Sequence, residues 1–247
     1  MRVDLAWLPP AEAPRDRTCV VVDVLRATSS VAVLLGRGLR GVYPAADIEA
    51  ARALRARLGE GVLLCGERNA LPPEGFDAGN SPTEFAHADL GRWSEAVMAT
   101  TNGTPALLAC LAAPLVLAAA PLNAAATIEA CLAAERDVLL VCAGRRGQRA
   151  SDDALAAALL VRRLVERGAA PEANAREGLA LLDAAGGALA GAFRMTEHGR
   201  ALLELGFEAD LDFCAEESRY DVAAALRIEN GIAVLRPLAL GLATPAA

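Results

Sequence analysis

Four polar loops of this 247-residue chain carry the side chains that could do chemistry. The first loop begins with Asp23, directly after the apolar run Val20–Val22, and continues to Arg26. A carboxylate at the end of a buried strand can bind Mg²⁺ or act as a nucleophile, and an arginine can hold an anion through two hydrogen bonds. The alternative is structural, with Asp23 closing a turn and pairing with Arg26.

The second loop is long for a compact chain and runs from Gly66 to the start of a predicted helix at Ser81. Loops of this length are usually functional, and Glu67 and Arg68 directly follow the predicted buried strand Val62–Cys65. We therefore expect both side chains at an edge of the sheet where ligands bind. The alternative is an irregular surface loop that ends in a helix cap.

The third loop, Thr100-Thr101-Asn102-Gly103-Thr104, joins a predicted strand to a predicted helix. Its small hydroxyl and amide groups could form a neutral cradle for an anion, although the local sequence alone favours ordinary capping of the helix by Thr101 or Asn102.

The fourth loop follows Cys142 and places three arginines between residues 145 and 149, just before Asp152 and Asp153. Cations are disfavoured near the start of a helix, so these arginines indicate a bound anion or ion pairs with the two acids. The loop of cysteine phosphatases would need arginine where this chain has Gln148, and this predicts a packed thiol at Cys142. His198, further along, is compatible with anion binding, weak acid–base chemistry or a local hydrogen bond.

Composition excludes several classes of protein. The formal net charge is −7, which disfavours a nucleic-acid binder, and the 24 basic residues are all arginine, which excludes lysine-based phosphate loops and Schiff-base enzymes. No export signal or membrane span is visible, and the six cysteines show no metal-binding spacing, so we expect a cytoplasmic protein with reduced thiols. Several carboxylates and arginines together suit one Mg²⁺ ion and a small polyanion, which is what hydrolysis of a phosphate ester requires.

The order of apolar runs alternates between strand and helix patterns, which predicts an α/β fold with a mainly parallel or mixed sheet. Near the end of the chain, Leu211–Cys214 reads as a strand and residues 227–235 as a hairpin that turns at Asn230-Gly231. A weak break in the pattern of strands and helices near Pro121 suggests two α/β lobes, residues 1–121 and 122–247. The alternative is one intertwined domain.

Three segments together resemble the Mg²⁺-dependent 2-phosphosulfolactate phosphatase family: VVVDVLRATSS, GERNALPPEGFDAGNSP and TTNGTPAL. VCAGRRGQ followed by SDDAL, and later HGRALLELGFEADLDFCA, resemble further segments of that family in the same order. The resemblance implies a three-layer α/β/α fold of two related lobes with the active site between them. It also implies hydrolysis of (2R)-2-phospho-3-sulfolactate to 3-sulfolactate and phosphate, as in coenzyme M biosynthesis.

Carried over to this sequence, the resemblance points to a defined set of residues, which also includes Gly79 and Cys142. The expected catalytic group is Asp23, Arg26, Glu67 and Arg68. Substrate contacts are expected from Thr28, Asn69, Asn80, Ser81, Thr101, Asn102, Gly103, Thr104 and Gly144. We expect Mg²⁺ to be held, directly or through water, by Asp23, Glu67 and Asp153. The residues after Gly147 depart from the family pattern, which leaves a different 2-phospho-hydroxy acid open as the substrate.

Two other functions remain open from the sequence: a non-catalytic binder of small phosphorylated or carboxylated anions, and a phosphatase of broad specificity. The route of hydrolysis is open as well, between water activated by the metal and a phospho-Asp23 intermediate. Leu25 occupies the position where phospho-aspartate enzymes place a second aspartate, which weakens the covalent route. The expected partner is a small anionic phospho-acid, with a homodimer as the expected assembly.

Overall fold

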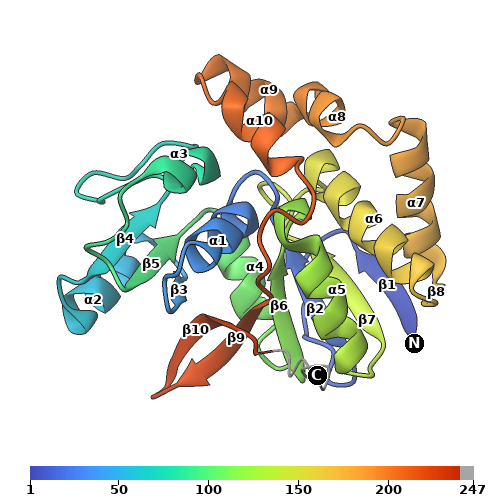
Figure 1. The fold of residues 1–247 in the computed structure, drawn as a ribbon, viewed down its shortest axis with the longest axis horizontal. Coiled ribbons are helices and arrows are strands. Elements are labelled where there is room, and N and C mark those ends of the chain that lie inside the picture. Colours follow the sequence, from blue (N-terminus) through green and yellow to red (C-terminus); the bar gives the residue numbers. More distant parts are fainter. Residues whose placement is uncertain (240–247) are drawn as a thin grey trace, which may run out of the picture.

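The structure is a computed structural model that describes residues 1–239. Within these residues a single ten-stranded sheet runs through the protein, and helices pack on both of its faces (Figure 1). The predicted α/β fold with helices on both sides of a mixed sheet is therefore confirmed.

The strands follow one another across the sheet in an order very different from their order in the chain. From one edge to the other they are β4 (Val62–Gly66), β5 (Glu95–Ala99), β3 (Val42–Ala45), β10 (Ile232–Pro237), β9 (Ala224–Glu229), β6 (Leu115–Ala119), β2 (Thr18–Val22), β7 (Val138–Cys142), β1 (Arg2–Ala6) and β8 (Ala170–Pro171).

The helices lie mostly in the connections between strands. They are α1 (Ala27–Gly36), α2 (Ile48–Leu58), α3 (Pro82–His87), α4 (Gly103–Ala109), α5 (Ala124–Ala133), α6 (Ser151–Glu166), α7 (Ala173–Ala184), α8 (Leu189–Met195), α9 (Glu197–Glu204) and α10 (Glu208–Cys214), with a single 3-10 turn, η1, at Pro121–Asn123. Within residues 1–239, none of them has both the length and the apolar character needed to cross a bilayer.

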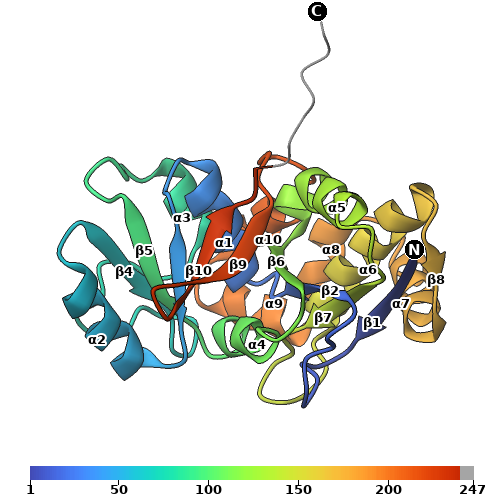
Figure 2. The ribbon, with the colours of Figure 1, turned by 90° about the horizontal axis from the view of Figure 1, so that it is seen from below.

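Two groups of parallel strands make up the sheet. One contains β4, β5 and β3, and the other contains β6, β2, β7, β1 and β8. The hairpin of β9 and β10 lies between the groups and pairs antiparallel with both, as Figure 2 shows. Asn230 and Gly231 both have positive φ, as a tight hairpin turn requires, so the predicted turn is confirmed.

The sheet crosses the division that the sequence suggested near Pro121. Strands β1 and β2 precede that residue, yet both pair with β7, which follows it. The assignment of separate lobes to residues 1–121 and 122–247 stays a prediction.

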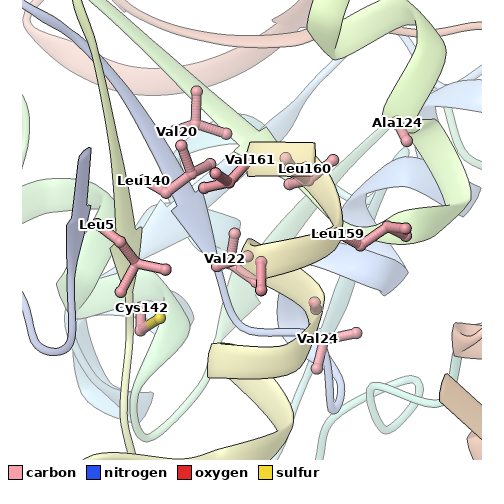
Figure 3. Close-up of a cluster of buried hydrophobic side chains, with 14 of the residues drawn as sticks. Leu5, Val20, Val22, Val24, Ala124, Leu140, Cys142, Leu159, Leu160 and Val161 are labelled. Carbon is pink, nitrogen blue, oxygen red and sulfur yellow. The ribbon is translucent and has the colours of Figure 1, made fainter. Parts of the chain in front are cut away.

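Side chains of β2 point alternately into two apolar cores, one on each face of the sheet. Val20 and Val22 pack against α6, while Cys19 and Val21 pack on the side of α1 and α4. Figure 3 shows the first core, where Cys142 lies among aliphatic side chains of the sheet. After Thr18 the strand is apolar at every position, because both of its faces are covered.

All six cysteines are free and buried, as predicted for reduced thiols. Burial raises the pKa of the Cys142 thiol well above its usual value, and the carboxylates of Asp153 and Asp152 raise it further. The burial of Cys142, with 1% of the residue exposed, agrees with the predicted packed thiol.

The prediction of a strand at Leu211–Cys214 is wrong, because these residues end helix α10. Four residues with one exposed position among buried ones fit a short strand and a short helix equally well, so periodicity alone cannot separate the two. The two acidic side chains in the first turn, Glu208 and Asp210, favour the helix through its dipole.

Gly66 ends β4 with a positive φ, and a Cβ at this position would overlap the carbonyl oxygen of Ala99 on β5. We expect Gly66→Ala to lower the free energy of unfolding by more than about 2 kcal/mol, because both the backbone angle and the close approach oppose a side chain. Gly61→Ala is the matched control, since Gly61 precedes the same strand with open space around it. Urea unfolding of both variants measures the difference, and equal losses would contradict the assignment of strain to Gly66.

Candidate active site

A cavity of about 120 Å³ lies where the loops after β2, β4, β5 and β7 meet the first turns of α9. Residues from all four polar loops line this cavity, Asp23 and Glu67 among them, whereas Arg68 and Asp153 do not. The polar residues of its lining are Asp23, Arg26, Glu67, Asn69, Asn80, Thr100, Thr101, Asn102, Arg145, Arg146 and His198. Helices α9 and α10 lie over this region, next to α3 and α6 (Figure 1).

Asp23 contributes a buried carboxylate to the cavity, with 6% of the residue exposed. The Thr28 hydroxyl accepts a hydrogen bond from the Asp23 backbone N–H at 3.1 Å and donates one to its carbonyl oxygen at 2.9 Å. This closes the turn through backbone atoms and leaves the carboxylate for the cavity. Thr28 therefore shapes the loop.

Burial raises the pKa of Asp23 to about 7. The charge of His198 lowers it, while the carboxylates of Glu67 and Asp152 raise it. A site that holds a buried carboxylate among other acids is one that a cation would stabilise.

Glu67 ties the second loop to the third. Its Oε2 accepts a hydrogen bond from the backbone N–H of Ala70 at 2.9 Å, and its Oε1 accepts one from Thr101 at 2.7 Å. Each carboxylate oxygen can accept a further interaction, so Glu67 remains available to a cation in the cavity.

Arg26 also lines the cavity but is held firmly in place. Its guanidinium donates to Asp210 Oδ2 and to the carbonyl oxygen of Ala70, both at 2.7 Å, and its plane stacks on the ring of Phe207. Both charged side chains are almost completely buried. With these partners the guanidinium forms a fixed part of the cavity wall. Only its remaining N–H groups can donate hydrogen bonds to a ligand.

The other oxygen of Asp210 joins this pair to the start of α3. It accepts hydrogen bonds from the Ser81 hydroxyl at 2.7 Å and from the Thr83 backbone N–H at 3.2 Å. Ser81 also accepts from the Glu84 N–H, which confirms the predicted helix cap. The Ser81 hydroxyl is therefore engaged by protein groups.

Asp153 and Arg68 lie away from the cavity lining. Both oxygens of Asp153 accept backbone hydrogen bonds, from Val24 at 2.9 Å and from Gly144 at 3.0 Å, so this buried carboxylate holds the first and fourth loops together. Arg68 is exposed and borders a shallow depression beside Asp47. A direct metal contact of Asp153 and an anion contact of Arg68 stay predictions.

The remaining residues of the predicted set divide between the lining and its support. Asn69, Asn80, Thr101 and Asn102 line the cavity. Thr104 pairs with Thr100 at the start of α4, and a Cβ on Gly103 would overlap the Asp23 carboxylate, so this glycine permits the close approach of α4.

The cavity residues with ionisable side chains that are absent from the expected site are Arg145, Arg146 and His198. The run of arginines was the available signal, but the sequence could not distinguish a bound anion from ion pairs. In the structure Arg145 pairs with Glu197, while Arg146 reaches the lining through a left-handed backbone turn, with its N–H donating to Asn102 Oδ1.

The oxygen groups of the cavity fit a magnesium ion that keeps water and substrate ligands. Within residues 1–239, no three acidic, histidine or cysteine side chains cluster tightly enough to hold a metal alone. Asp23 and Glu67 line the cavity together, and the buried Asn80 Oδ1 has no hydrogen-bond partner among the described residues. One or two carboxylates completed by water and phosphate oxygens is the usual donor set for Mg²⁺.

A model of the 2-phosphosulpholactate phosphatase family matches residues 7–228. The chain belongs to this family. It is 38% identical over 236 residues to a Thermotoga petrophila protein named probable 2-phosphosulfolactate phosphatase, covering 95% of this chain and 98% of the relative. A Deinococcus radiodurans protein of the same name is 38% identical over 221 residues, covering 88% of this chain and 89% of the relative.

Replacing Asp210 tests the buried pair. We expect Asp210→Ala to lower the free energy of unfolding by about 3–5 kcal/mol, because Arg26 would be left buried without its counter-charge. Asp212→Ala is the control on the same helix, since its pair with Arg194 is exposed, and it should cost less than about 1 kcal/mol. Urea unfolding measures both, and a similar loss for the two variants would refute the special role of Asp210.

The pKa of Asp23 predicts how stability depends on pH without a metal. Below about pH 4 the carboxyl is neutral in both the folded and the unfolded chain. Between about pH 4 and 7 it ionises only in the unfolded chain, so the stability of the folded state falls over this range and then levels off above about pH 7. In the presence of a chelator, Asp23→Asn should therefore exceed the wild type in stability at pH 8, by up to about 4 kcal/mol, and match it near pH 4.

The control is Glu60→Gln, which removes an exposed carboxylate and should leave stability unchanged at both pH values. Urea unfolding at each pH provides the comparison. An Asp23→Asn variant that is less stable than the wild type at pH 8 would show that burial does not raise the pKa of the Asp23 carboxyl.

Proposed function

We propose that this protein is a Mg²⁺-dependent phosphatase that hydrolyses (2R)-2-phospho-3-sulfolactate, or a related 2-phospho-hydroxy acid, to the hydroxy acid and phosphate. The observation that carries the proposal is one cavity lined by two carboxylates, Asp23 and Glu67, and by Arg145 and Arg146 in addition to the paired Arg26. Membership of the family and the names of the relatives support the same reaction.

The negative and positive side chains of this small cavity would bind different groups. Asp23 and Glu67 would hold the metal ion, and the Asn80 amide oxygen is available to a ligand of that ion. Arg145 and Arg146 supply positive charge for the phosphate and for the second anionic group of the substrate. In a chain of net charge −7, such local cations are what attract a polyanion.

Magnesium would supply charge neutralisation on the phosphate and a position for the attacking water. Thr101 and Asn102 line the same cavity with hydroxyl and amide groups that can donate to phosphate oxygens. We infer attack by water and not by Asp23, because Leu25, two residues on, is a buried aliphatic side chain that gives no proton to a departing group.

We infer that the protein works in the cytoplasm. Six buried free cysteines support a reducing environment, as in the cytoplasm, and a place in coenzyme M biosynthesis accords with the proposed substrate.

Release of phosphate tests the function. We expect turnover of 2-phosphosulfolactate or 2-phospholactate with Mg²⁺, loss of turnover with a chelator, and a fall of at least about 10³-fold in kcat/KM for Asp23→Asn, because the variant lacks a charge that the metal needs. Glu60→Gln serves again as the control and should keep full activity.

The other outcomes separate the rival functions. Binding of these phospho-acids without any turnover would favour an anion-binding protein. Equal kcat/KM on p-nitrophenyl phosphate and on unrelated sugar phosphates would indicate a phosphatase of broad specificity. Undiminished turnover after complete chelation would contradict the magnesium requirement.

A further inference from the structure

His198 lines the cavity, but the proposed binding of metal and phosphate gives this residue no role. It lies in the first turn of α9, where Thr196 caps the helix by accepting a hydrogen bond from the Gly199 N–H. The imidazole is 18% exposed and borders the same cavity as Asp23 and Arg146. The helix therefore delivers one imidazole ring to the place where the substrate would bind.

Asp152 fixes the direction of this ring. Its Oδ2 lies 3.1 Å from His198 Nδ1, and the Asp152 side chain is only 3% exposed. A carboxylate accepts hydrogen bonds, so Nδ1 carries the hydrogen in this contact and Nε2 lies on the opposite side of the ring. A buried carboxylate that orients an imidazole in this way is the arrangement by which proteins select one tautomer for proton transfer.

The proposed reaction needs such a proton donor. When the phosphorus–oxygen bond of a 2-phospho-hydroxy acid breaks, the leaving oxygen becomes an alkoxide, a very strong base. The substrate's own leaving group therefore requires protonation as the bond breaks, and among the residues that line the cavity His198 is the only histidine.

We propose that His198 protonates the leaving oxygen of the substrate, with Asp152 as the positioning residue that aims it. This assignment rests on the proposed phosphatase function. Water attacks phosphorus and forms a new P–O bond, the bond to the ester oxygen breaks with its electron pair, and that oxygen takes the proton from Nε2 of the imidazolium. The proton that the attacking water loses passes to solvent, and solvent restores the imidazolium.

Charged groups from several elements face this ring. Asp152 comes from α6, Asp23 from the loop after β2, and Arg145 and Arg146 from the loop after β7. Glu197, the neighbour of His198 on α9, is paired with Arg145. Because side chains of both charges surround His198, the test compares substrates with different leaving groups instead of measuring a pH profile.

Two substrates that differ in one atom separate proton donation from binding. One is 2-phospholactate, and the other is its analogue with sulfur in place of the bridging oxygen. A thiolate is a much weaker base than an alkoxide and leaves without a proton. We expect His198→Ala to lower kcat on the oxygen ester by about 10²–10⁴-fold and on the sulfur ester by less than about 10-fold.

Two further variants complete the design. Asp152→Asn keeps the shape of the side chain and should show a smaller loss with the same selectivity for the oxygen ester, because the ring is still present but less well aimed. His87→Ala is the matched control, since the other histidine of the chain is exposed on α3 and contacts the Thr83 carbonyl oxygen. It should leave both rates unchanged.

Equal losses of His198→Ala on the two esters would overturn the proposal, because they would assign His198 to binding or to structure. An unchanged rate on the oxygen ester would overturn it as well. Failure of the proposed function is a separate result, since it shows as the absence of phosphate release by the wild-type protein with Mg²⁺ on either ester.

Discussion

The buried pair of Arg26 and Asp210 is the interaction on which the geometry of the cavity depends. An unpaired charge in this position would cost several kcal/mol, so each partner requires the other to be in place. Through the second oxygen of Asp210 and the Ala70 carbonyl, the pair joins the first loop, the second loop, α3 and α10. Segments about 184 residues apart in the chain are thus positioned together by one ion pair.

The twist of the sheet explains how loops from its two parallel groups can meet. The β9–β10 hairpin reverses the direction of β3, β4 and β5 relative to β2 and β7, which in a flat sheet would place their carboxyl ends on opposite edges. Neighbouring strands rotate by roughly 20–25°, so the five steps from β2 to β5 accumulate about 100° or more. That rotation allows the ends of both groups to approach one cavity.

Local patterns were enough to predict much of the fold and the loops of the site. Apolar runs identified β2 and β4, and the start of α3 was expected at Ser81, which caps that helix. What the sequence could not supply was the partner of each polar group. Arg26 was expected to grip an anion, but its counter-charge comes from Asp210, in a segment whose short apolar run was taken for a strand. Arg145 and Arg146 were visible as a cluster, yet only the fold shows that they border the cavity.

Helix α6 begins with two neighbouring acids that face different surroundings, since Asp152 meets an imidazole and Asp153 meets two backbone amides. Successive side chains of a helix diverge by about 100°, and this angle is what separates the two destinations. Inserting a single residue between Asp152 and Asp153 would turn one carboxylate about 100° further around the helix and away from its partner. The two contacts together therefore fix the rotation of α6 about its own axis.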